Sequence, residues 1–269
     1  MQGIAAELQV AVVEIGGLPV RLFTDNASFL EMARERYGSF LRPGNQAGID
    51  LTIDLAPPGI LSAQEDVCVT RQSTRWRAER GDFHLDWDSE SGQGVLRQSC
   101  NPYSLDTALR ILHTLVLAKQ GGFLLHAASA VRNGRAFLFF GASGAGKTTI
   151  TRAAPADAVV LTDEISYVRR FGEGYAAYGT PFTGELAKLG ENVSAPIAGL
   201  YHLVQAPHNR ISPLGPGDAA RALLESILFF AEDAELVKCV FQSACDIVSR
   251  VPVYRLDFMP DQRVWDLIV

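Results

Sequence analysis

Alternation of apolar and polar residues predicts a series of strands in the first hundred residues. Residues 49–55 read IDLTIDL, in which every second side chain is apolar, as in a strand with one buried face. Turn-forming sequences such as Gly81-Asp82 separate the later runs, so we expect an antiparallel meander there. The other strands predicted in this region are Val10–Ile15, Val20–Phe23, Val67–Arg71, Arg75–Glu79, Phe83–Trp87 and Val95–Gln98.

Two helices are predicted from their capping residues and from helical spacing. Ser28 and Glu31 form a capping-box pattern that opens a helix reaching about Tyr37. Asn101 is a good N-cap and Pro102 suits the first helical position, and the leucines that follow recur at helical spacing. We therefore expect a second helix that ends after Lys119, before a pair of glycines.

The residues after 100 read as a mixture of strand-type and helix-type runs, and we expect a chain of the α/β class. We place a domain boundary near residue 100. Residues 1–100 are expected to form a small antiparallel α+β domain of unknown role, and 101–269 a second domain. Its predicted strands are Phe123–Val131, Arg135–Phe140, Ala158–Thr162, Ile165–Arg170, Tyr175–Tyr178, Ile197–Gln205 and Val253–Leu256. Its predicted helices are a short one to about Ala154, then Ala219–Phe230, Ala234–Val248 and one from near Asp261.

Composition narrows the class of protein. The chain has 269 residues, is 48% hydrophobic and 20% charged, and carries a net charge of -6, so it can form a sizeable core. No excess of positive charge is present to attract nucleic acid or an anionic membrane surface, and neither is an expected partner. The first residues lack a signal-peptide pattern, and the four cysteines have no metal-site spacing. We expect a cytoplasmic protein with reduced, mostly buried thiols.

A glycine-rich loop carries the strongest chemical signal. GASGAGKT, residues 141–148, satisfies G-x-x-x-x-G-K-[ST] between a predicted strand and a predicted helix. Glycines let successive backbone N–H groups point at phosphates, Lys147 would reach the β- and γ-phosphates, and the Thr148 hydroxyl would join a Mg²⁺ shell. The predicted nucleotide-binding residues are Gly141, Ala142, Ser143, Gly144, Ala145, Gly146, Lys147, Thr148 and Thr149.

The strand before this loop is expected to form a hairpin with the preceding strand. Asn133-Gly134 lies between two apolar runs, and this dipeptide favours a tight type I′ turn. The loop's strand would then be antiparallel to its predecessor, whereas common P-loop NTPases place it in a parallel sheet. His126, on the preceding strand, would lie beside the loop. Alone, a histidine in an apolar strand is more often a core residue.

Two acids follow the next predicted strand, in the sequence LTDE. Asp163 and Glu164 resemble a Walker B ending, where one carboxylate binds metal and the other accepts a proton from the attacking hydroxyl. Acids at a strand end are also often merely exposed to solvent. The upstream glycine loop favours a functional role.

These segments together resemble the catalytic domain of bacterial HPr kinase/phosphorylase, which is related to the phosphoenolpyruvate carboxykinase nucleotide fold. The resemblance rests on Leu125-His126-Ala127, the hairpin, GASGAGKTT and LTDE, and is greater to the HPr-kinase-related proteins of peptide-modification systems. It covers roughly residues 102–269. It implies a P-loop domain with a mixed sheet, with ATP and Mg²⁺ as cofactors.

The resemblance also implies roles for single residues. His126 would contact the transferred phosphate, Lys147 would neutralise charge, Asp163 would be the catalytic base, and Thr148 and Glu164 would lie on the metal side. The segment Gly179–Glu185 is similar to G-[ST]-P-[FW]-x-G-E of the related proteins, so Glu185 is a further candidate metal ligand; a surface turn is the alternative.

The sequence also departs from the family pattern. HPr kinases usually carry two aspartates where this chain has Asp163-Glu164, so the base and metal roles could be exchanged. The glycine-rich segment associated with phosphorylase activity is not found. Its absence weakens the case for phosphorylase activity and for HPr as the substrate. HPr kinases form hexamers, so a homo-oligomer is possible, although no interface signature is evident.

The expected function is therefore an ATP-dependent kinase that transfers the γ-phosphate to a hydroxyl, with a serine of a peptide or small protein as acceptor. Two alternatives remain. The acceptor could be a small-molecule alcohol, or the protein could be a nucleotide-binding sensor or assembly module without transfer activity. The sequence does not discriminate ATP from GTP.

Overall fold

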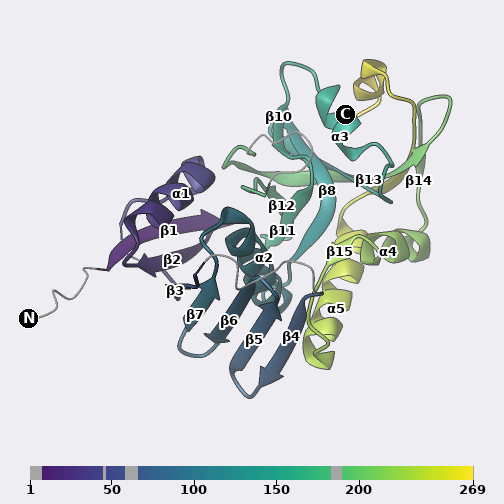
Figure 1. Cartoon of the computed structure of the whole chain (residues 1–269). Helices are drawn as coiled ribbons and strands as arrows, with labels where there is room; N and C mark the ends of the chain where they lie inside the picture. The colour runs from purple at the N-terminus through teal and green to yellow at the C-terminus, as the bar shows by residue number, and fades with distance from the viewer. Residues whose placement is uncertain (1–7, 45–46, 58–65, 183–189, 269) are drawn as a thin grey trace, which may run out of the picture. The chain divides into compact units, whose positions relative to one another are not determined.

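The computed structural model describes residues 8–44, 47–57, 66–182 and 190–268. The chain divides into two units, which are drawn in Figure 1. Unit 1 is Met1–Leu112 with Phe230–Asp233, and unit 2 is His113–Phe229 with Ala234–Val269. The division falls inside helix α2 (Pro102–Lys119).

Unit 1 is built on a seven-stranded mixed sheet with the order β1-β2-β3-β7-β6-β5-β4. The predicted antiparallel meander is confirmed for β4 to β7, but the expectation of a wholly antiparallel sheet is wrong. β3 runs parallel to both β2 and β7. The helix between β2 and β3 lets the chain return in the same direction for the first of these pairings. The strands are β1 (Gln9–Ile15), β2 (Leu18–Thr24), β3 (Ile49–Leu55), β4 (Cys68–Gln72), β5 (Arg75–Arg80), β6 (Phe83–Asp88) and β7 (Gln93–Gln98).

Helix α1 (Ala27–Tyr37) ends where the sequence predicted, but its cap is a different residue. Asn26, not Ser28, is the N-cap, and its side chain accepts a hydrogen bond from the N–H of Phe29 at 2.9 Å. Asn and Ser are similar in cap preference, so sequence alone did not decide between them. A 3₁₀ turn, η1 (Gly38–Phe40), follows the helix.

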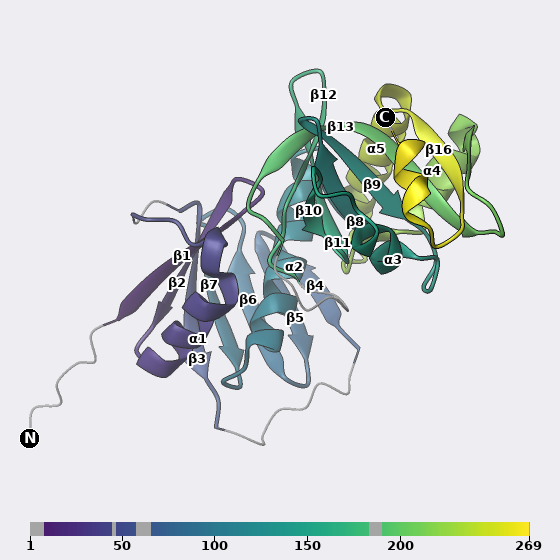
Figure 2. The ribbon, with the colours of Figure 1, turned by 90° about the horizontal axis from the view of Figure 1, so that it is seen from above.

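One face of this sheet is apolar and the other is polar. Figure 2 shows α1 lying across the strands, and its buried residues include Phe29 and Tyr37. Strand residues at every second position, such as Leu51, Trp76 and Leu85, are buried. Their neighbours are exposed or half-buried and mostly charged, which is the period-2 pattern predicted for 49–55.

Unit 2 contains a nine-stranded mixed sheet in which five strands pair in a closed circuit. β8 pairs with β11, β11 with β12, β12 with β13, β13 with β9, and β9 again with β8. The strands are β8 (Phe123–Arg132), β9 (Arg135–Phe140), β10 (Val159–Thr162), β11 (Ile165–Phe171), β12 (Gly174–Tyr178), β13 (Ser194–Gln205), β14 (Arg210–Pro213), β15 (Ile227–Leu228) and β16 (Val253–Phe258).

The predicted hairpin before the glycine loop is confirmed. β8 and β9 pair antiparallel, and both turn residues have positive φ, 52° at Asn133 and 71° at Gly134. On its other side β9 runs parallel to β13. The strand that leads into the glycine loop therefore has one antiparallel and one parallel neighbour.

The two faces of β9 belong to different cores. Leu138 packs in a cluster with residues of α4 and α5, whereas Phe139 packs in a cluster that contains Ile150 and Trp265. The sheet is therefore covered on both faces, as in an α/β protein. The helices are α3 (Lys147–Arg152), α4 (Pro216–Leu224), α5 (Ala234–Arg250) and the 3₁₀ helix η2 (Gln262–Asp266).

Two predictions are corrected, one about the extent of a helix in this unit and one about the cysteines of the whole chain. The helix expected over Ala219–Phe230 ends at Leu224, because Ile227–Leu228 pairs with β8 as strand β15. β14 was not predicted. Three cysteines are exposed and Cys239 is half-buried, all with free thiols, so the expectation of mostly buried thiols is wrong.

Among the described residues, no helix is long and apolar enough to cross a membrane.

Candidate functional site

One cavity of unit 2 is lined by residues from three separate segments of the chain. Its volume is about 230 Å³. The segments are β8, the glycine loop with the start of α3, and the acids after β10. The lining residues are His126, Ser143, Gly144, Gly146, Lys147, Thr148, Thr149, Asp163 and Glu164. Of the predicted site residues, Gly141, Ala142 and Ala145 do not line this cavity, and Glu185 lies outside the described residues.

The glycine loop connects the end of β9 to the first turn of α3. Its glycines adopt conformations that other residues rarely take, with φ of 78° at Gly144 and 110° at Gly146. The N–H of Ala145 donates to the carbonyl of Ala142 at 3.1 Å, which closes a tight turn inside the loop. Ala145 itself is buried in the core beneath.

Several backbone N–H groups of the loop have no acceptor within the described part of the chain. They belong to Gly144, Gly146 and the first three residues of α3, Lys147 to Thr149, all of which line the cavity. The first N–H groups of a helix have no partner in the helix itself. Successive N–H groups without acceptors form a concavity that suits an anion, above all a phosphate.

Lys147 is held at the base of the loop. Only 8% of the residue is exposed, and its Nζ donates to the carbonyls of Gly141 at 3.0 Å and Ala142 at 3.1 Å. Burial lowers the pKa of the Lys147 amine, while the negative charge of Glu164 acts in the opposite direction. The loop residues that do not line the cavity thus hold the ammonium group beside it.

The two acids occupy a short turn between β10 and β11. The Thr162 Oγ1 accepts hydrogen bonds from the N–H groups of Glu164 and Ile165, each at 3.2 Å. Asp163 is 4% exposed, and Glu164 is half-buried. A side chain at the end of β10 therefore fixes the backbone that carries both carboxylates.

Strand β8 brings His126 to the same place. Both strands beside the acid turn pair with β8, and Ile165 lies directly opposite His126. The N–H of His126 donates to the carbonyl of Ser226 at 2.8 Å, just before β15. The register of these pairings places the half-buried imidazole next to Asp163 and Glu164 in the cavity wall.

The segment after β12 packs beside the acid turn. The Thr180 hydroxyl donates to the carbonyl of Ile165 at 2.8 Å, and a Cβ on Gly190 would lie 1.8 Å from the carbonyl oxygen of Leu161. These contacts place Thr180 against β11 and Gly190 against β10.

The donors and acceptors around the cavity suit a magnesium-bound triphosphate. The ammonium of Lys147 and the backbone N–H groups match phosphate oxygens, and the Thr148 hydroxyl and Glu164 are the hard oxygen ligands that Mg²⁺ takes. Among the described residues no group of three His, Cys, Asp or Glu could hold a metal ion. Mg²⁺ commonly uses one or two protein ligands and completes its shell with phosphate and water.

The size of the cavity can be compared with that of a small ligand. At roughly 30 Å³ for each water molecule, 230 Å³ corresponds to about seven or eight waters. That is below the roughly 300 Å³ of a typical small-molecule pocket. The cavity is therefore large enough for the phosphate end of a nucleotide.

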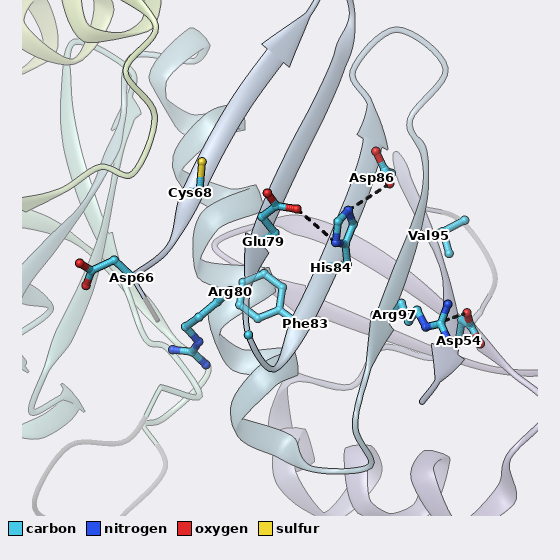
Figure 3. Close-up of a pocket in the computed structure, with 11 residues that line it drawn as sticks. Asp54, Asp66, Cys68, Glu79, Arg80, Phe83, His84, Asp86, Val95 and Arg97 are labelled. Carbon is cyan, nitrogen blue, oxygen red and sulfur yellow. Dashed lines mark ion pairs between the residues drawn. The ribbon is translucent and has the colours of Figure 1, made fainter. Parts of the chain in front are cut away.

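A larger cavity, of about 570 Å³, lies on the polar face of the unit 1 sheet and is drawn in Figure 3. Its charged side chains pair across neighbouring strands: His84 Nδ1 is 3.3 Å from Glu79, and Arg97 Nε is 3.8 Å from Asp54. Exposed pairs of this kind contribute little to stability. The arrangement agrees with a solvent-exposed sheet face, as the sequence predicted.

Sequence reasoning missed two residues that touch the glycine loop. Gln205 Nε2 donates to the carbonyl of Gly144 at 2.7 Å, and the ring of Phe258 lies against Gly146. Both stand at the ends of strands, far from the loop in sequence, and no local motif marks them. A reliable register between β9, β13 and β16 would have been needed to find them.

The fold is that of a mixed α/β protein, and the cavity is lined in part by a glycine loop whose sequence satisfies G-x-x-x-x-G-K-[ST]. The sequence model of the family described as SynChlorMet cassette protein ScmC matches residues 99–268, which is more than half of the chain. The chain belongs to this family. The match begins just before α2 and includes the glycine loop and the acid turn. No curated protein matches the chain.

Proposed function

We propose that this protein is an ATP-dependent kinase that transfers the γ-phosphate to a hydroxyl group, with a serine of a peptide or small protein as acceptor. The observation that carries the proposal is the shared cavity: a lysine ammonium, a row of backbone N–H groups, an imidazole and two carboxylates line one space of about 230 Å³. The resemblance to HPr-kinase-related proteins supports the same reaction and a location in the cytoplasm, where ATP is supplied.

In the proposed reaction the protein's residues position groups and neutralise charge. Bound Mg²⁺·ATP supplies the phosphoryl group and the divalent charge. The loop N–H groups and Lys147 hold phosphate oxygens and stabilise the negative charge that develops on them. His126, on β8, contacts the transferred group.

Asp163 orients the acceptor hydroxyl and takes its proton. The bond between the γ-phosphorus and the β–γ bridging oxygen breaks while the new bond to the acceptor oxygen forms, and ADP leaves. General-base catalysis of this kind contributes about 10² to 10⁴ in rate. Glu164 and Thr148 remain on the metal side.

Binding and transfer are tested separately, because the acceptor is unidentified. Thermal unfolding with and without Mg²⁺·ADP measures binding, and ADP release from ATP is measured with serine-containing peptides and with small alcohols. Lys147→Ala should weaken nucleotide binding about 10- to 100-fold, since it removes charge-assisted contacts. Lys238→Ala, an exposed lysine on α5, is the matched control.

Three results would overturn the proposal in distinct ways. Absence of any stabilisation by nucleotides would exclude the site. Unchanged transfer in Lys147→Ala would exclude the role of the loop. Binding without consumption with every acceptor would indicate a nucleotide sensor. Lys147→Met, which keeps the side-chain volume, replaces the alanine variant if that variant does not fold.

A further inference from the structure

Gln205 connects the end of β13 to the tip of the glycine loop. Its side-chain amide nitrogen lies 2.7 Å from the carbonyl oxygen of Gly144, across 61 positions of sequence. A carbonyl oxygen only accepts hydrogen bonds, so the contact atom is the donor Nε2. Gln205 is exposed and stands opposite Phe258, the residue that packs against Gly146. β13 and β16 are adjacent parallel strands. The last residue of β13 contacts Gly144, and the last residue of β16 contacts Gly146.

The hydrogen bond fixes one peptide plane of the loop at both ends. The carbonyl of the Gly144–Ala145 peptide accepts from Gln205, and its N–H, on Ala145, donates to Ala142 at 3.1 Å. Both polar groups of this peptide are therefore engaged by the protein. The N–H groups on either side, of Gly144 and Gly146, have no acceptor among the described residues, and both glycines line the cavity.

We propose that Gln205 is a positioning residue of the phosphate cavity: it holds the Gly144–Ala145 peptide so that the flanking N–H groups remain directed to a bound phosphate. This inference rests on the proposed function and adds a residue to it. Gln205 acts through Gly144 and does not itself line the cavity. Without this hydrogen bond, the unliganded loop has more accessible conformations. Binding must then order the loop, and the free-energy cost of that ordering lowers the affinity.

An exposed side chain allows the positioning role to be separated from a structural one. One neutral hydrogen bond at the surface adds little to folding, so removing it should leave the unfolding temperature of the unliganded protein within about 2 °C of wild type. The dissociation constant for a phosphate ligand should change nonetheless, since the loop must be ordered when the ligand binds. A merely structural role would move the unfolding temperature instead.

The experiment compares two Gln205 variants with a matched control, using full-length protein and Mg²⁺·ADP. Gln205→Met keeps the length and volume of the side chain and lacks the donor. It should raise the dissociation constant roughly three- to tenfold, which is the change expected when one hydrogen bond is lost. Gln205→Glu also lacks the donor and adds a negative charge near the phosphates, so it should weaken binding further, and more so at low ionic strength. Gln242→Met, exposed on α5, should bind like wild type.

The outcomes separate this inference from the proposed function. Wild-type affinity in Gln205→Met, while Lys147→Ala has lost binding, overturns the inference and leaves the proposed function standing. A large fall in the unliganded unfolding temperature of Gln205→Met overturns it as well, because the residue would then be structural. If wild-type protein does not bind Mg²⁺·ADP, both proposals fail.

Discussion

The ring of Phe258 occupies the space in which Gly146 would carry a side chain. A Cβ on Gly146 would lie 2.6 Å from Cε1 and 2.8 Å from Cδ1 of that ring. The backbone of Gly146 also has a φ of 110°, which L side chains rarely adopt. Two independent causes, a steric contact and a backbone conformation, therefore require glycine at this position.

Gly146→Ala should destabilise the protein more than Gly144→Ala. The first substitution combines a strained φ with overlap against Phe258, for a total of about 2–4 kcal/mol. The second has a φ of 78° but no atom within 4 Å of the added Cβ, so only the backbone strain of about 1–2 kcal/mol applies. Urea unfolding of both variants without nucleotide measures the difference.

A second substitution isolates the steric part. Phe258→Leu shortens the side chain that a Cβ on Gly146 would meet, so Gly146→Ala should cost less in the Phe258→Leu background than in wild type. An equal cost in the two backgrounds would show that the contact with Phe258 contributes nothing to the requirement for glycine.

Neutralising each of the two acids in the turn after β10 should impair a different property, transfer in one variant and Mg²⁺-dependent binding in the other. If Asp163 is the proton acceptor, as proposed, Asp163→Asn should retain binding of Mg²⁺·ADP and lose transfer by about 10² to 10⁴. If Glu164 lies on the metal side, as proposed, Glu164→Gln should raise the Mg²⁺ concentration needed for binding. Titrations of nucleotide and Mg²⁺, with ADP release at saturation, separate the two effects. If Asp163→Asn loses metal-dependent binding and Glu164→Gln loses only transfer, the two roles are exchanged.

His113 should make the folded state less stable in mild acid. The residue is fully buried, its Nδ1 is 3.2 Å from the Tyr167 hydroxyl, and burial lowers its pKa to about 3, against 6.5 for an exposed histidine. Below pH 6.5 the unfolded chain takes up a proton that the folded chain does not accept. The free energy of unfolding therefore falls as pH decreases from 6.5 towards 3, by up to about 1.4 kcal/mol per pH unit, and is unaffected by this group above that range.

His113→Phe tests this linkage, because it keeps a buried ring and cannot be protonated. Urea unfolding at pH 7 and pH 5 should show that wild type loses about 2 kcal/mol more than the variant between these two values. Other titrating groups are common to both proteins and cancel in the comparison. An identical loss in the two proteins would mean that His113 is protonated in the folded state as readily as in the unfolded one.

Elements with local signals were predictable from the sequence. The hairpin before the glycine loop follows from Asn133-Gly134, because few other dipeptides accept positive φ at both positions. The helix from Pro102 to Lys119 has a strong cap, and Asn101 indeed accepts a hydrogen bond from the N–H of Ser104 at 2.9 Å. The segments that line the cavity were found in the same way, from motifs a few residues long.

Long-range pairing was not predictable. Ile227–Leu228 follows helix-favouring residues, and only its pairing with Leu124 and Leu125 of β8 makes it a strand. The parallel pairing of β3 with β2 and β7 was not predictable either, because nothing in residues 49–55 specifies which strands they pair with. The contributions of Gln205 and Phe258 to the loop depend on such pairings.

The support that Phe258 gives to the glycine loop has a consequence for synthesis. The motif is complete in the growing chain once Thr149 has been added, yet β16, which carries that ring, is made more than a hundred residues later. A nascent chain that exposes the motif therefore lacks the strand against which the loop packs. The loop is therefore expected to reach its final conformation only after β16 has joined its sheet, late in synthesis.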